Sequence, residues 1–113
     1  MNKKKLNILW TNADPQTSEL MVLMYAKNVI PKKWWDEAEV IIWGKTAKLV
    51  AQDKRIQELV AEAQESGVKF TACQSCADKL CIKQELEKLG IELKFMGQPL
   101  TDIIQNGEKL LTV

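Results

Sequence analysis

The chain has 113 residues, 46% of them hydrophobic and 27% charged, a size and balance that fit one compact domain over residues 1–113. Sixteen basic and fifteen acidic residues nearly cancel, so charge gives no reason to expect nucleic acid or an anionic membrane as a partner. Histidine is absent, which removes the commonest general base and the commonest zinc ligand.

The first elements are a short strand and a long helix. Leu6–Thr11 is rich in branched and aromatic residues, as strands are, and Asp14-Pro15 then supplies a helix cap followed by a first-turn proline. This helix is expected to run to about Ile30. Its stretch Leu20–Ala26 is an unbroken apolar run, which predicts either deep burial or contact with a partner subunit.

The rest of the chain continues the alternation of strands and helices. Strands are predicted at residues 39–43, 68–71, 91–96 and 110–113, and helices at 46–51, about 56–67, 77–89 and 100–105. Such alternation implies parallel pairing through right-handed crossovers, which gives a three-layer α/β/α sandwich with a five-stranded, mainly parallel sheet.

Reactive groups and ligands gather at the carboxyl ends of strands in sheets of this kind. Cys73 follows the third strand and precedes a helix, where unpaired backbone N–H groups favour a thiolate. By topology alone, Asn12, Gly44 and Gly97 are candidates to line the same rim.

Cys73 and Cys76 form a CxxC pair, which allows several interpretations. The first is a dithiol, in which the upstream thiol attacks and the downstream thiol resolves. The second is part of a thiolate metal site, but one chain supplies at most three soft ligands, so no metal is assigned. The third is a nucleophilic cysteine that carries sulfur as a persulfide, and the fourth is a pair of unreactive buried residues.

The third cysteine, Cys81, lies at a bend between Leu80 and Ile82, and we expect it to be structural. An odd number of cysteines argues against a disulfide framework and for a reducing compartment. No apolar run approaches the roughly 18 residues of a membrane span, and Leu6–Trp10 is too short for a signal-peptide core. We therefore expect a cytoplasmic protein. The basic cluster Lys3–Lys5 is interpreted as a solvated amino terminus.

Several segments together resemble small proteins of the DsrE/DsrF-like family over nearly the whole chain. These are the polar loop after the first strand, the apolar strand ending at Trp43-Gly44, the stretch Gly67–Cys73 and the closing Met96–Leu100. The most specific feature is a cysteine that ends the third strand, followed eight residues later by a position that is usually glycine and then by an aliphatic residue. Here these residues are Cys73, Cys81 and Ile82.

The resemblance implies that Cys73 matches the sulfur-accepting cysteine of the sulfur-relay members, and that the chain forms homo-trimers or homo-hexamers. It implies a persulfide carrier or sulfurtransferase-like protein that works with sulfur donor and acceptor proteins and needs no cofactor. Cys76 has no counterpart in many of those proteins. Two other functions stay open: a CxxC redox protein or sensor, and a module that binds a small ligand or partner and whose cysteines are incidental.

Overall fold

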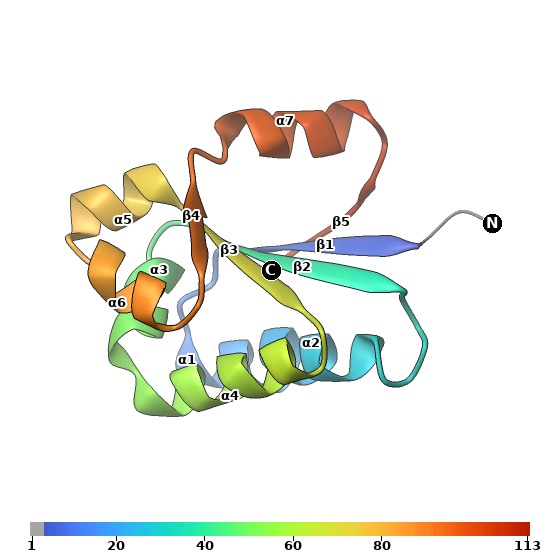
Figure 1. The fold of residues 1–113 in the computed structure, drawn as a ribbon, viewed down its shortest axis with the longest axis horizontal. Coiled ribbons are helices and arrows are strands. Elements are labelled where there is room, and N and C mark those ends of the chain that lie inside the picture. The colour runs from blue at the N-terminus through green and yellow to red at the C-terminus, as the bar shows by residue number, and fades with distance from the viewer. Residues whose placement is uncertain (1–3) are drawn as a thin grey trace.

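The structure is a computed structural model that describes residues 4–113, so Lys3 of the basic cluster lies outside the described residues. Strands and helices alternate from β1 to β5 (Figure 1). The strands are β1 (Lys5–Trp10), β2 (Glu37–Ile42), β3 (Lys69–Cys73), β4 (Glu92–Lys94) and β5 (Lys109–Thr112). The helices are α1 (Pro15–Thr17), η1 (Ser18–Leu23), α2 (Met24–Val29), α3 (Thr46–Gln52), α4 (Lys54–Glu65), α5 (Gln74–Leu80), α6 (Lys83–Lys88) and α7 (Gly97–Gln105).

The five strands form one sheet in the order β4-β3-β2-β1-β5, and every pairing is parallel. This confirms the predicted α/β class. The first three connections step along the sheet in one direction, whereas the connection from β4 to β5 returns across it. Because crossovers between parallel strands are right-handed, the reversed connection must place its helix on the opposite face. Figure 1 shows α7 on one side of the sheet and α2 and α4 on the other.

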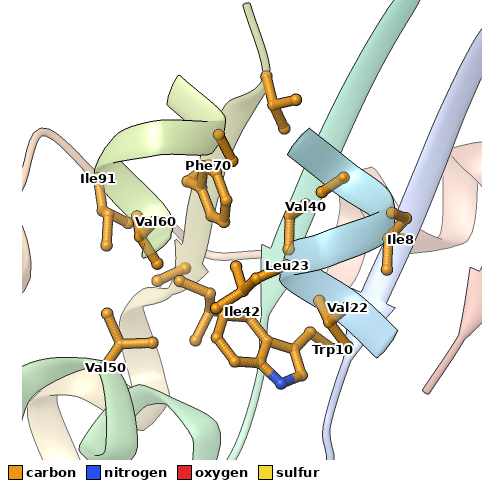
Figure 2. Packing of buried hydrophobic residues seen from close by; sticks show 14 of the residues in the cluster. Ile8, Trp10, Val22, Leu23, Val40, Ile42, Val50, Val60, Phe70 and Ile91 are labelled. Carbon is orange, nitrogen blue, oxygen red and sulfur yellow. The ribbon is translucent and has the colours of Figure 1, made fainter. Parts of the chain in front are cut away.

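The main core lies between the sheet and the helices opposite α7 (Figure 2). Alternate residues of the strands supply one side of it, with Ile8 and Trp10 from β1 and Phe70 from β3. Leu23 and Val60 pack against them from the helices. A smaller apolar cluster under α7 occupies the other face of the sheet. None of the helices within residues 4–113 is long and apolar enough to span a membrane.

The long first helix is interrupted by a π-helical segment, η1, between α1 and α2. The apolar run Leu20–Ala26 is not deeply buried along its whole length, so that prediction is wrong. Val22, Leu23 and Ala26 are in the core. The side chains of Leu20 and Met24, however, are 59% and 52% exposed. The run therefore covers the core on one side and presents apolar side chains to solvent on the other.

The prediction of one helix over residues 77–89 is also wrong, because the structure divides it into α5 and α6. The break lies at Cys81, whose backbone is left-handed, with φ 59° and ψ 41°. The Cys81 N–H donates to Asp78 O, and the Ile82 N–H donates to Ala77 O. These two bonds form a Schellman motif, which ends α5 and buries Ile82 against the core.

Candidate functional site

The candidate site lies at the carboxyl edge of the sheet, where β3 ends and α5 begins. Cys73 is the last residue of β3 and has an extended backbone, with φ −67° and ψ 117°. This confirms the predicted position of the cysteine at a strand end. The alternation of β3 directs Cys73 to the same face as Thr71, the face that α7 covers.

Apolar side chains surround Cys73, which is only 5% exposed. It packs in one cluster with Ile41 of β2, Met96 and Ile103 of α7. Strand β4 is shorter than predicted, since Phe95 and Met96 leave the sheet, and Met96 becomes buried in this cluster. Cys73 is therefore a thiol enclosed among apolar side chains rather than an open surface nucleophile.

Cys76 lies one turn into α5 and is half-buried against the same cluster. The backbone N–H of Gly44, in the loop after β2, donates a hydrogen bond to Cys76 Sγ at 3.3 Å. Thr46 holds this loop in place, because its hydroxyl donates to Trp43 O at 2.7 Å and to Trp10 O at 2.9 Å. The loop thus presents one fixed backbone donor to the second thiol.

The surroundings of Cys76 both raise and lower the pKa of its thiol. Burial raises the pKa of the Cys76 thiol above its ordinary value, and the neighbouring Cys73 acts in the same direction. The Gly44 N–H and the Lys79 ammonium lower the pKa of this thiol. When one of two adjacent thiols ionises, the other holds its proton more tightly, so the pair carries one negative charge more readily than two.

The other predicted rim residues lie along this edge but differ in their contacts. Gly44 meets the CxxC pair directly through its hydrogen bond to Cys76. Gly97 begins α7 next to the buried Met96, but its own surface is exposed and its carbonyl accepts a bond from Thr101. Asn12 is exposed, and its side-chain oxygen accepts from the Asp14 N–H at 2.9 Å, within its own loop. Of the three glycine and asparagine candidates, Gly44 is the one with a described bond to a site thiol.

Cys81 lies apart from the pair, on the surface at the far end of α5. Its role in the fold is conformational, since it occupies the left-handed position that ends the helix. Glycine would adopt that conformation without the steric cost of a Cβ.

Sequence reasoning missed two features of the site's surroundings. One is the burial of Cys73 in a cluster with Met96 and Ile103, which depends on where α7 crosses the sheet. The other is a buried hydrogen bond from Thr71 Oγ1 to Glu39 Oε2 at 2.9 Å, on the same face as Cys73. The alternation Thr71-Ala72-Cys73 could have revealed the shared face, but the pairing with Glu39 requires the strand register. Within residues 4–113 no group of three or more histidine, cysteine, aspartate or glutamate side chains could hold a metal ion.

Similar proteins agree with this architecture. A protein of unknown function from Bacteroides thetaiotaomicron, BT1422, is 39% identical, with a TM-score of 0.95 over 97% of this chain and 95% of that chain. The YchN protein of E. coli is 16% identical, with a TM-score of 0.72 over 97% of this chain and 99% of that one. A protein of unknown function from Methanobacterium thermoautotrophicum, MTH1491, is 15% identical, with a TM-score of 0.79 over 97% and 99% of the two chains.

The similarities to YchN and MTH1491 concern the fold alone. No curated protein matches the chain. The sequence profile of the DsrE/DsrF-like family, however, matches residues 12–113, which include the polar loop, the CxxC pair and all of α7. The chain belongs to the DsrE/DsrF-like family.

Proposed function

We propose that this protein is a cysteine-based persulfide carrier of the sulfur-relay type, in which Cys73 holds the sulfane sulfur. Family membership is consistent with a sulfur-relay-related role. The observation that carries the proposal is the position of Cys73: it ends a central strand, and a second thiol and apolar side chains surround it. Apolar surroundings suit a persulfide, because they keep water and competing thiols away from a sulfur that is easily reduced.

The proposed reaction moves one sulfur atom without net oxidation. The Cys73 thiolate attacks the outer sulfur of a donor persulfide, the new S–S bond forms, and the donor leaves as a thiolate. An acceptor thiolate then removes the same sulfur and restores Cys73. Cys76 offers a second exit, in which its thiolate attacks Cys73 Sγ, forms a Cys73–Cys76 disulfide and releases sulfide.

Intact mass spectrometry after long incubation with inorganic polysulfide tests this function. A sulfur adduct should form on wild-type protein and on Cys76→Ser, where peptide mapping should place it on Cys73, whereas in Cys73→Ser any adduct should map to Cys76 alone. All three proteins should carry the additional change Cys81→Ser, because the exposed third thiol would otherwise add its own adduct. A wild-type site that never carries sulfur would refute the carrier proposal.

A dithiol redox protein is the second candidate, and the packing of Cys76 against the Cys73 cluster favours it. The reduction potential of the pair separates the two functions. A working redox switch needs a potential near the cytosolic glutathione poise, about −220 to −320 mV depending on the method. A pair that does not form a disulfide across this range would leave the carrier function as the better account.

We further propose that the protein is a homo-oligomer, a trimer or hexamer, that uses the exposed apolar side of η1 and α2. Leu20, Met21, Met24 and Trp34 line a hollow of about 280 Å³ there, together with Tyr25 and Asn28. Trp34 stacks on Tyr25 with the ring centroids 5.9 Å apart, so this surface is ordered rather than loose.

Light scattering at micromolar concentration tests the oligomer. Met24→Lys should shift the mass towards the monomer, because it places a charge in the proposed contact. Ile104→Lys is the matched control, since Ile104 is also an exposed apolar residue but lies on α7. A monomeric wild-type protein would contradict the proposal, as would equal effects of the two substitutions.

A further inference from the structure

The two thiols of the site differ in how a donor can approach them. Cys73 is buried in the apolar cluster that includes Met96 and Ile103, and it has little exposed surface. Cys76 is half-buried at the edge of the same cluster, next to the exposed Ser75 and Lys79. A protein that presents a persulfide on its own surface therefore meets Cys76 before it can meet Cys73.

We propose that Cys76 is the first acceptor, which takes sulfur from the donor and passes it inward to Cys73. This order rests on the proposed carrier function and assigns the two cysteines consecutive roles within it. Cys73 is then the storage thiol, and its apolar surroundings protect a sulfur that has already entered the protein.

Both steps balance without an oxidant or a reductant. The Cys76 thiol first loses its proton to solvent, and its thiolate attacks the outer sulfur of a donor R–S–SH. The Cys76–sulfur bond forms, the donor S–S bond breaks, and R–S⁻ leaves, so that Cys76 becomes Cys76–S–SH. The Cys73 thiolate then attacks the outer sulfur of that persulfide. The products are Cys73–S–SH and the Cys76 thiolate, which takes up a proton from solvent.

The contacts of Cys76 suit a thiol that is nucleophile in the first step and leaving group in the second. In both roles its sulfur carries negative charge. Burial raises the pKa of this thiol on balance, but the Gly44 N–H, which donates to the sulfur at 3.3 Å, and the Lys79 ammonium, one turn further along α5, both favour the charged form. The donor therefore increases the fraction of Cys76 that is thiolate before the first step, and it lowers the barrier of the second step, in which negative charge develops on the leaving sulfur.

The position of Cys73 suits the receiving role. The CxxC spacing keeps the two cysteines one helical turn apart, and both pack in the same cluster. The transfer between them is therefore intramolecular, and such transfers gain from the high effective concentration of the acceptor. No movement of α7 is needed for a bulky donor, because only one sulfur atom has to pass inward.

The test compares loading rates from a small and a bulky donor in the Cys81→Ser background. Inorganic polysulfide is the small probe, and persulfidated serum albumin is the bulky one. With albumin persulfide, Cys76→Ser should slow the loading of Cys73 by about ten-fold or more, a barrier change of about 1.4 kcal/mol. With polysulfide the same substitution should have a smaller effect. Cys76→Ala repeats the comparison without a hydroxyl, and circular dichroism checks that both variants are folded.

The wild-type thiols provide a readout that needs no substitution in the pair. Rapid quenching followed by peptide mapping should find the sulfur adduct on Cys76 first and on Cys73 later. In Cys73→Ser the adduct should accumulate on Cys76, since the thiol that would take its sulfur is missing.

Different results would refute the order of sulfur transfer and the carrier function. Loading of Cys73 at the wild-type rate from both donors in Cys76→Ser would overturn the order of transfer and leave the carrier function intact. The same holds if mapping finds the adduct on Cys73 first. No adduct on either thiol in the Cys81→Ser protein would instead refute the carrier function itself.

Discussion

Cys81→Gly should stabilise the protein, because Cys81 holds a left-handed backbone at the end of α5. Its φ of 59° brings the Cβ close to the following carbonyl, which costs a residue other than glycine about 1–2 kcal/mol. Glycine avoids this cost, but its greater freedom in the unfolded chain takes back about 0.4–1 kcal/mol. The difference spans about 0–1.6 kcal/mol, and its midpoint predicts a net gain of about 0.8 kcal/mol. The exposed Cys81 side chain has little burial to lose.

The chain contains its own comparison for this position. Gly67, Gly90 and Gly107 have φ values of 103°, 76° and 68°. Each follows a helix, and the N–H of each glycine donates to the carbonyl three residues earlier, as the Cys81 N–H does. Three helix ends therefore have the residue that the motif favours, and α5 has a cysteine in its place.

Urea unfolding under reducing conditions, monitored by circular dichroism at fixed protein concentration, measures the change in the free energy of unfolding. In a thermal melt, the predicted gain corresponds to a rise of about 2–5 °C in Tm for a chain of this size. Cys81→Ala is the matched control, because alanine removes the thiol but keeps the Cβ, and it should stay within about 0.5 kcal/mol of wild type. If Cys81→Gly is no more stable than Cys81→Ala, backbone strain at this position is not the cause we infer.

Three other predictions follow from single contacts. Thr71→Val removes the buried hydrogen-bond donor to Glu39, and it should lower the free energy of unfolding by about 1–3 kcal/mol. Urea titration measures this loss, and an unchanged midpoint would mean that the bond contributes nothing to stability. Asp53→Ala removes the side chain that caps α4 by accepting from the Ile56 N–H at 3.0 Å, and the same titration should show a loss of about 0.5–2 kcal/mol. Cys73→Ala should lower the pKa of Cys76, because Cys73 contributes to raising it, so the pH profile of Cys76 alkylation by iodoacetamide should move to lower pH. A profile that does not move would assign the raised pKa to burial alone.

Much of the architecture could be predicted from local patterns. The alternation of strand and helix signals was enough for a parallel α/β sheet, and the position of Cys73 at a strand end followed from the residues before it. Helix ends marked by glycine were also readable, as at Gly67 and Gly90. At Cys81 the sequence indicated a bend but not the end of a helix, because Leu80-Cys81-Ile82 is apolar and contains no residue that usually stops a helix.

The geometry of the site was harder to predict, because its contacts join distant segments. Gly44 and Cys76 are 32 residues apart, and their hydrogen bond exists because β2 and β3 are adjacent and in register. The sequence alone placed Gly44 on the rim through its position after a strand, but the same logic also chose Asn12 and Gly97. Neighbouring positions on one edge of a sheet do not by themselves define which side chains touch.

The sequence by itself determined which segments form strands and helices, and which residue ends the third strand, since these depend on local periodicity and on turn residues. Only the tertiary structure decided that Cys73 is enclosed and Cys76 accessible. That difference arises because the connection from β4 to β5 carries α7 to the second face of the sheet, where Cys73 is buried in the cluster that includes Met96 and Ile103 and Cys76 is only partly buried. The order of the strands sets this difference in burial, and it comes from contacts summed over the whole chain.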